Sequence, residues 1–445
     1  MHMRGASIMK PEKKYASVFE LNGIPRMSQA FPLALQHVVA MIVGCVTPAI
    51  VISGVAGLTS RDQVIFVQAA LFIAAISTLI QLFPIAGKIG SGLPVILGVS
   101  FAYLPSMEAI AGSFDIATIL GAQLIGGIAA IFVGLFITKL RALFPPLITG
   151  TVVFTIGLSL YPTAVRYMAG GSSSPTYGSW QNWLVGFITL AIVIVLNHFA
   201  KGLLKLASIL IAMIIGYIIA FFFGMIDFSA VSSAGLFQIP QPLHFGIKFE
   251  ASAIVTMVLL FVINSVQAIG DFSATTGGGL DREPTDKELS GGIVAYGITN
   301  ILGAFFGGLP TATFSQNVGI VATTKVVNRV VLGLAAVIIL LAGFLPKFSA
   351  LLTTIPQCVL GGATISVFAS IAMTGIKLVV QQPLSYRNTS IVGLAVALGM
   401  GITQCSESLA SFPAWVTTVF GKSPVVVTTI TAILLNLILP KDKEQ

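Results

Sequence analysis

Residues 311–325 read TATFSQNVGIVATTK, and this stretch lies within an apolar part of a 445-residue chain that is 56% hydrophobic. Three neighbouring side chains in it, Ser315, Gln316 and Asn317, carry hydroxyl or amide groups. Such groups are costly to place in hydrocarbon unless they have hydrogen-bond partners. The stretch therefore predicts a polar site inside an otherwise apolar protein.

The composition places the chain in a membrane. Only 9% of its residues are charged, and its mean hydropathy is +0.98, values that are incompatible with a water-soluble globule. Apolar runs of about 17 to 25 residues recur between Phe31 and Pro440 and lack the alternation of a lipid-facing barrel. We therefore expect an all-α integral membrane protein with about 14 transmembrane segments. The expected segments are 31–56, 64–87, 93–112, 116–138, 145–163, 181–198, 204–223, 252–276, 290–306, 310–325, 330–345, 357–376, 389–406 and 423–439.

Basic residues predict the orientation of the chain. If alternate loops lie on opposite sides, most of the basic residues share the side of the N-terminal tail, which is the cytosolic side by the positive-inside rule. The residues on that side are Arg4, Lys10, Lys13, Lys14, Arg26, Lys88, Lys139, Arg141, Lys201, Lys205, Arg282, Lys287, Lys325, Arg329, Lys377, Arg387, Lys441 and Lys443. Those on the other side are Arg61, Arg166, Lys248, Lys347 and Lys422. We expect a multi-pass protein of the plasma membrane with both termini in the cytosol. The net charge of +8 fits this orientation and a bilayer with anionic headgroups, and predicts no nucleic-acid partner.

Two segments are interrupted at corresponding places in the two halves of the chain. Gly92-Leu93-Pro94 opens the third segment and Gly308-Leu309-Pro310 opens the tenth. Each is followed by a short stretch with strand-like residues, VSFAYL at 99–104 and TATF at 311–314. Paired interruptions of this kind are typical of transporters built from repeats, with the binding site where the breaks meet.

The distance from Gln316 to the basic residue Lys325 indicates the depth of the amides. It is about 14 Å as a helix, or roughly half the thickness of the hydrocarbon. Gln316 and Asn317 would then lie near the midplane at the start of a half-helix, where free N–H groups point into the gap. Such a place suits a small polar ligand with carbonyl oxygens.

The eighth segment adds Gln267 and Asp271, which are four residues apart and share one helix face. We expect Asp271 to be the one acidic residue that belongs to neither a tail nor a loop. An acid within a crossing marks a proton relay or an ion or substrate site. The alternative is that Asp271 pairs with a polar neighbour or lies at the cytosolic interface.

Two further residues are open to two interpretations each. His37, within the first segment, either orients its neighbours or takes part directly as a ligand or titrating group. Phe101, at the break of the third segment, either packs in the core or stacks on a planar heterocycle.

The stretch QNVGIVATTK resembles the signature of the nucleobase–ascorbate transporter family, also called nucleobase:cation symporter 2. Its pattern is Gln or Glu, then Asn-x-Gly-x-x-x-x-Thr, then Arg, Lys or Gly. The fixed positions are matched by Gln316, Asn317, Gly319, Thr324 and Lys325. QHVVAM in the first segment, SFAY in the third and IGDFSAT in the eighth are also similar, so the resemblance covers nearly the whole chain.

The resemblance implies 14 segments in two inverted repeats of seven, with short strands in the broken segments 3 and 10. It implies an N-terminal tail (1–28), two halves of a core domain (29–140 and 250–346) and two halves of a gate domain (141–249 and 347–445). Members import nucleobases, usually with a proton, and tend to be homodimers. The implied substrate-binding residues are Phe101, Gln267, Phe314, Ser315, Gln316 and Asn317. The implied coupling residues are Asp271 and His37, and Gly319, Thr324 and Lys325 support the motif.

Gln316 is similar to the purine-type members, whereas uracil-type members tend to have Glu at this position. A carboxamide offers a donor and an acceptor side by side, which matches the lactam of an oxopurine. Xanthine or uric acid is therefore the expected substrate, and a uracil permease is the alternative. Gln267 departs from the family, because members commonly have Glu there, and an amide cannot carry a coupling proton.

Other function classes are less compatible with the sequence. An anion transporter or exchanger of the same general fold would favour a basic residue near the site, and none stands within the relevant crossings. An enzyme is not expected, since the crossings contain no nucleophile–base pair and no metal-ligand set. No cofactor is predicted.

Overall fold

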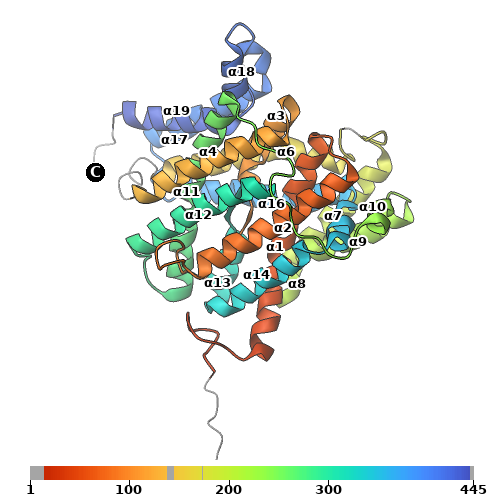
Figure 1. The fold of residues 1–445 in the computed structure, drawn as a ribbon. Coiled ribbons are helices and arrows are strands. Elements are labelled where there is room, and N and C mark those ends of the chain that lie inside the picture. Colours follow the sequence, from red (N-terminus) through yellow and green to blue (C-terminus); the bar gives the residue numbers. More distant parts are fainter. Residues whose placement is uncertain (1–14, 138–144, 173, 441–445) are drawn as a thin grey trace, which may run out of the picture.

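The computed structural model describes residues 15–137, 145–172 and 174–440 (Figure 1). The first fourteen residues of the predicted tail, with Arg4, Lys10, Lys13 and Lys14, lie outside the described residues, as do Lys139, Arg141, Lys441 and Lys443. The described chain is helical apart from two short strands.

The first half of the chain runs from α1 to α10. Its elements are α1 (Met27–Val55), α2 (Ser60–Leu82), β1 (Leu97–Val99), the 3-10 turn η1 (Phe101–Tyr103), α3 (Leu104–Ser113), α4 (Ile116–Leu135), α6 (Pro146–Met168), α7 (Trp180–Phe199), α8 (Gly202–Leu206), α9 (Ser208–Phe222) and α10 (Ser229–Ser233).

The second half runs from α11 to α19. Its elements are α11 (Ala251–Leu280), α12 (Asp286–Phe306), β2 (Thr311–Thr313), α13 (Ser315–Thr324), α14 (Arg329–Gly343), α15 (Pro346–Thr353), α16 (Gln357–Val379), α17 (Tyr386–Gln404), the 3-10 turn η3 (Ser406–Leu409), α18 (Ala414–Phe420) and α19 (Pro424–Ile438).

The helices confirm a multi-pass membrane protein. Within the described residues, 8 helices are long and apolar enough to cross a membrane, or 9 if the pair α14 and α15, bent by 84°, is one span. Every stretch that we expected to cross contains a helix or a strand–helix unit. Length and composition nevertheless single out fewer crossings than the expected number. The broken segments and the apolar helices α9 and α19 are too short to span alone, and α17, although 19 residues long, is not among the sufficiently apolar helices.

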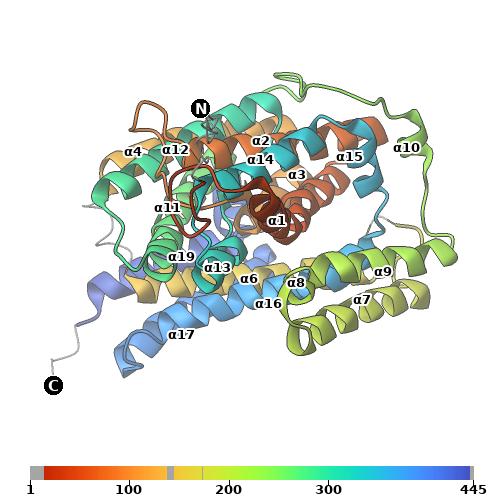
Figure 2. The same cartoon turned by 90° about the horizontal axis from the view of Figure 1, so that it is seen from below.

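The helices form two layers, which Figure 2 shows as an upper and a lower row. We call the upper row the first helix group; it contains α1–α4 and α11–α14, which pack against one another. We call the lower row the second helix group; it contains α6, α7, α9, α16, α17 and α19. Each group therefore combines helices from both halves of the sequence.

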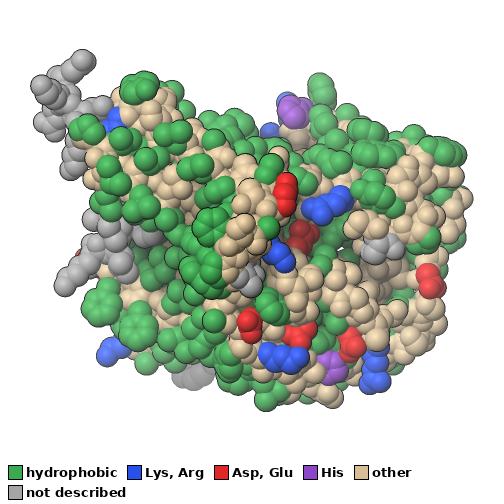
Figure 3. All heavy atoms as spheres, turned by 90° about the horizontal axis from the view of Figure 1, so that it is seen from above, with side chains coloured by type: hydrophobic (Ala, Val, Ile, Leu, Met, Phe, Trp, Pro, Cys, Tyr) green, Lys and Arg blue, Asp and Glu red, His purple; other side chains and the backbone are tan. Residues whose placement is uncertain are grey.

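Large hydrophobic side chains cover much of the outer surface. On α7 and α9, Phe199 and Phe222 are 80% and 81% exposed, and Trp180 and Phe187 are exposed as well. The space-filling view in Figure 3 shows broad areas of hydrophobic side chains, with charged side chains in the centre and along the lower edge and a few elsewhere. In water this surface would aggregate, whereas in a bilayer it contacts lipid.

The two breaks meet at a pair of antiparallel strands. In β1 and β2, Leu97 lies opposite Thr313 and Val99 opposite Thr311. The breaks thus carry short strands, as predicted, but the first strand lies earlier than the stretch 99–104. Ser100 accepts a hydrogen bond from the backbone N–H of Ala102 and starts a 3-10 turn there, which ends the strand.

The strand pair is held by polar side chains of the flanking helices. Thr78 on α2 donates to the carbonyl oxygen of Leu97 and accepts from its N–H, both at 3.0 Å. Asn300 on α12 accepts from the N–H of Thr311 at 2.8 Å and donates to its carbonyl oxygen at 3.3 Å. The outward-facing backbone groups of Leu97 and Thr311, which the partner strand does not reach, are thereby paired in the apolar interior.

The start of α12 confirms a local prediction from the sequence. Thr285 Oγ1 accepts a hydrogen bond from the N–H of Glu288, and the Glu288 carboxylate accepts one from the N–H of Thr285, so that both halves of a capping box are present. Arg282 forms an ion pair with Glu288 at 2.6 Å.

Candidate functional site

A cavity of about 230 Å³ lies between the two helix groups, beside the strand pair. The first group lines it with residues from α1, from the two breaks and from α11. The second group lines it with residues from α6, α9 and α16, and α8 contributes Leu206. Of the residues proposed from the sequence, the structure brings five to the cavity: Phe101, Gln267, Phe314, Ser315 and Gln316.

Two amide side chains face this cavity from different helices. Gln267 is half-buried on α11, and its Oε1 is buried without a hydrogen-bond partner among the described residues. Gln316 is the second residue of α13 and is exposed to the cavity. Because an unpaired buried acceptor is unfavourable, the site is suited to a ligand that offers an N–H group.

Two aromatic rings form an apolar part of the wall. Phe314 is buried against Gly98 of β1, where an added Cβ would lie 2.6 Å from its Cζ. Gly44 of α1 lies under the same ring, with the nearest ring atom 3.0 Å from where a Cβ would be. Phe101 packs edge-to-face on Phe368 of α16, with ring centroids 5.1 Å apart, so it connects the two helix groups.

Asp271 lies behind the cavity wall and is buried. Its carboxylate accepts hydrogen bonds from the hydroxyl groups of Thr313 and Ser315, the latter at 2.9 Å. Thr313 ends β2 and Ser315 begins α13, and both line the cavity. Asp271 therefore connects α11 to both sides of the break, through residues that line the cavity.

Asn317 and His37 form a second contact behind the wall. The Asn317 amide nitrogen lies 3.1 Å from His37 Nδ1 and donates to the His37 carbonyl oxygen at 3.2 Å. Both side chains are 1% exposed, and neither lines the cavity. The structure thus places Asn317 against α1, apart from its neighbour Gln316, with its Oδ1 unpaired.

The remaining motif residues lie along α13 towards its C-terminal end. Lys325 has a φ of 60°, a left-handed conformation that also suits the Gly that the signature allows at this position. Its Nζ donates to Asp281 at the end of α11, at 2.7 Å. Thr324 donates to the carbonyl oxygen of Ile320. Gly319 has nothing within 4 Å of where a Cβ would lie, so packing does not require glycine there.

One wall of the cavity and one acid were missed from the sequence. Thr364, Ser370 and Thr374 of α16 line the cavity from the second helix group. Hydroxyl residues on one face of an otherwise apolar segment were the signal that could have identified them. Glu108 lies within α3 and is half-buried. Our expectation that Asp271 is the one acidic residue outside the tails and loops is therefore wrong.

Comparison with known proteins identifies the chain's relatives. Residues 28–408 match the model of a family described as the Permease family. The chain is 36% identical to the uric acid permease PucJ of Bacillus subtilis, covering 94% of this chain and 95% of the relative. It is 35% identical to the xanthine permease of Bacillus subtilis, covering 91% and 92%.

A solved structure supports the fold. The transmembrane domain of a cyanobacterium bicarbonate transporter, BicA, superposes with a TM-score of 0.59 at 18% identity, covering 92% of this chain and 97% of that domain. At this identity the similarity concerns the fold alone. The family match and the relatives confirm the resemblance of the signature: the chain belongs to the permease family of nucleobase–ascorbate transporters, which are transport proteins rather than enzymes.

Proposed function

We propose that the protein carries a purine nucleobase across the membrane, with xanthine or uric acid as the preferred substrate. The observation that supports this most directly is the pair of amide side chains, Gln267 and Gln316, that line the cavity from α11 and α13. The relatives named for xanthine and uric acid support the same substrate class.

The chemistry of the wall matches an oxopurine. Amide groups at Gln267 and Gln316 provide donors and acceptors for the N–H and C=O groups along the edge of the base. Phe101 and Phe314 provide apolar surface for its planar faces. In this proposal Ser315 contacts the base, and Asn317 and His37 hold the start of α13 in place.

In this proposal transport occurs by alternating access between the two helix groups, which would serve as the core and gate domains. The burial of α1 supports one closed route, because every residue from Cys45 to Ser53 is buried. Towards the other end of the helices, Ser370 and Thr374 of α16 are exposed and line the cavity. We infer an inward-open state, with Lys325 on the cytosolic side and Arg166 outside.

Several finer features belong to the same proposal. The antiparallel pairing of β1 and β2 is compatible with 14 segments in two inverted repeats. Asp271 is the candidate proton carrier of a symport, because Gln267 cannot carry a proton. We also propose a homodimer in the plasma membrane with both termini in the cytosol, as the resemblance and the positive-inside rule imply.

An anion transporter is less compatible with this site, although BicA shares the fold. The described residues that line the cavity include no Lys or Arg. A fixed positive charge is the feature that an anion site would be expected to contain.

Uptake of radiolabelled bases into cells that lack their own purine permeases tests the proposal. The panel comprises xanthine, uric acid, hypoxanthine, guanine and uracil, with bicarbonate as the anion. We expect saturable uptake of xanthine or uric acid that uracil does not inhibit. Uptake of uracil alone would contradict the purine assignment, and counterflow in proteoliposomes would distinguish transport from binding.

A further inference from the structure

A second cavity, of about 320 Å³, lies between the helix groups at the Arg166 end of the molecule. The first group contributes the end of α1 and Glu108 of α3. The second group contributes Thr163 and Arg166 of α6 and Gln357 at the start of α16. This cavity shares no lining residue with the substrate cavity.

A polar contact crosses between the two groups inside this cavity. Thr163 Oγ1 donates to Glu108 Oε2 at 3.0 Å, and Arg166 Nη2 donates to Thr163 Oγ1 at 3.5 Å. Thr163 is buried and Glu108 is half-buried. An ionisable side chain within a membrane segment is costly, and its presence favours a functional role.

Apolar side chains separate the two cavities. The buried stretch of α1 from Cys45 to Ser53 runs between them. Phe101 and Phe368, which belong to opposite groups, are in ring contact beside the substrate cavity. A ligand moving between the cavities would have to part this ring contact and then the contact between Thr163 and Glu108.

We propose that Glu108 is a gating residue, whose hydrogen bond from Thr163 holds the Arg166-side route to the substrate cavity closed. The inference rests on the proposed alternating access. A polar contact suits this position because water can satisfy both partners when the groups separate, so that opening costs little more than the net hydrogen bond. The apolar ring contact beneath it excludes the substrate while the gate is closed.

Accessibility of a cysteine in the substrate cavity tests the gate without any purine. The reporter is Ser370→Cys in a background where Cys45, Cys358 and Cys405 are replaced by alanine. In intact cells a membrane-impermeant maleimide reaches the reporter only through the outer route. Removing a hydrogen bond to a charged group should raise the labelling rate roughly tenfold in Glu108→Ala. The isosteric Thr163→Val should act in the same direction.

Two further variants sharpen the test. Glu108→Gln can still accept from Thr163, so its labelling rate should lie between those of the parent and Glu108→Ala. Asp115→Asn is the matched control, because Asp115 forms an exposed ion pair with Lys248 on the same side and does not contact the second group. Its labelling rate should equal that of the parent.

The outcomes separate the gate from the substrate assignment. A single symmetric peak in size-exclusion chromatography reports that each variant is folded, and labelling in inverted vesicles shows that the exposed reporter is present and reactive. If folded Glu108→Ala and Thr163→Val both label at the parental rate, the gate is wrong even when purine uptake is normal. If labelling from outside rises but neither the parent nor any variant carries a purine, the gating role of Glu108 is supported and the purine assignment is wrong.

Discussion

At the scale of single residues, the neighbours Gln316 and Asn317 of one motif have different surroundings. Gln316 faces the cavity, whereas Asn317 is turned to His37 on α1. Successive helix residues are rotated by about 100°, so one can face a ligand while the next packs against a helix. The motif therefore combines a residue that lines the cavity with one that holds the half-helix against α1.

Gln316→Glu should weaken purine binding. The carboxylate only accepts hydrogen bonds, so the C=O of the base that the amide N–H served would be left unpaired in the cavity. We expect a loss of about 1 to 3 kcal/mol in binding free energy, measured by titration of the purified protein. Gln381→Glu, on the exposed surface after α16, is the control. Equal affinities of Gln316→Glu and the parent would show that Gln316 does not touch the base.

Asp271→Asn should separate coupling from binding. The amide oxygen can still accept a hydrogen bond, and the hydroxyl of Thr313 or Ser315 can reorient to accept from the new NH₂, so the contacts across the break are retained. The variant should bind purine and support counterflow but should not accumulate it in response to an imposed pH gradient. Accumulation by the variant as strong as that of the parent would assign Asp271 a structural role only.

At the scale of elements, the strand pair depends on glycine and on side chains of the neighbouring helices. An added Cβ at Gly98 would lie 2.5 Å from Cys45 Sγ as well as against the ring of Phe314. Thr78 and Asn300 supply the hydrogen bonds that two three-residue strands cannot supply to each other. These contacts anchor both breaks to helices of the first group.

Gly98→Ala should displace the Phe314 ring from the cavity wall. Overpacking of this kind costs about 1 to 3 kcal/mol, and here it should also reduce purine affinity because Phe314 lines the site. Gly277→Ala, on α11 with nothing within 4 Å of the added Cβ, should leave both unchanged. The melting temperatures and purine affinities of the two variants are compared with those of the parent. If Gly98→Ala has the parental melting temperature and the parental affinity, the close packing of Gly98 against Phe314 and Cys45 is contradicted.

Asn300→Leu should destabilise the fold more than a matched surface change does. It leaves the N–H and the C=O of Thr311 without their partner in an apolar interior, at a cost of about 1 to 3 kcal/mol for each group. Thr389→Val removes a hydroxyl that bonds only within its own exposed helix turn and serves as the control. Thermal unfolding in detergent measures both, and a smaller shift for Asn300→Leu than for Thr389→Val would refute this role.

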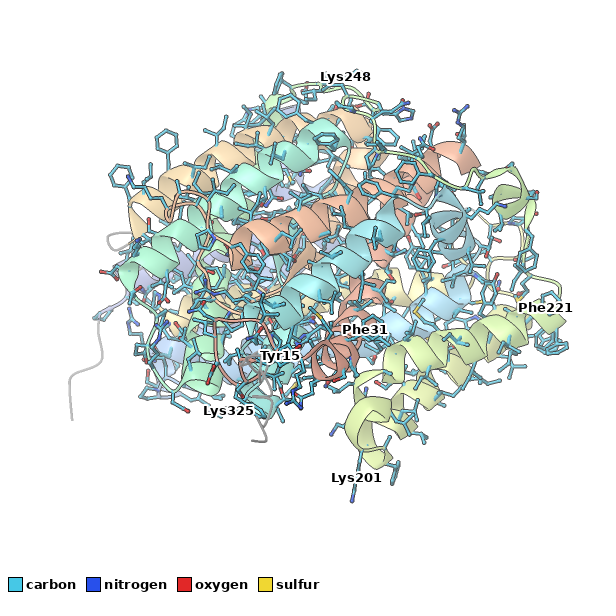
Figure 4. All side chains as sticks on the ribbon, turned by 60° about the horizontal axis from the view of Figure 1, so that its bottom comes forward. Tyr15, Phe31, Lys201, Phe221, Lys248 and Lys325 are labelled. Atoms are coloured by element: carbon cyan, nitrogen blue, oxygen red, sulfur yellow. The ribbon has the colours of Figure 1, made fainter. Side chains whose placement is uncertain are left out.

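At the scale of the whole molecule, the positions of exposed lysines and of the two cavities distinguish two ends of the molecule. Figure 4 shows Lys201 and Lys325 along one edge of the molecule and Lys248 at the opposite edge. The substrate cavity includes residues of α8 and α9 near Lys201. The second cavity, around Arg166, is lined by the C-terminal end of α1 and shares no lining residue with the first.

Cysteine labelling should confirm the two ends. In a cysteine-free background, Lys248→Cys should react with an impermeant maleimide added to intact cells, and Lys201→Cys should react only in inverted vesicles. Both side chains are exposed, so access through the protein does not limit either reaction. The opposite pattern of labelling would invert the proposed orientation and with it the direction in which the cavity opens.

The sequence by itself determined the class of protein, the family and those segments of the first helix group that line the cavity. The class follows from the length of the apolar runs, and the family follows from a motif of fixed spacing. The start of α12 at Thr285 was predicted from a capping-box pattern. All three are local properties of the chain. The start of α13 at Ser315 could also be predicted, because the polar residues Ser315, Gln316 and Asn317 interrupt an apolar run.

Only the tertiary structure decided which side chains face the cavity. A helix that is apolar on most sides gives little indication of its rotation, so Asn317 could not be separated from Gln316, nor α16 recognised as the second wall. The contact between Glu108 and Thr163 joins residues 55 positions apart on opposite helix groups. Such contacts arise from how two groups of helices pack, and no local pattern in the chain indicates that residues so far apart in sequence are in contact.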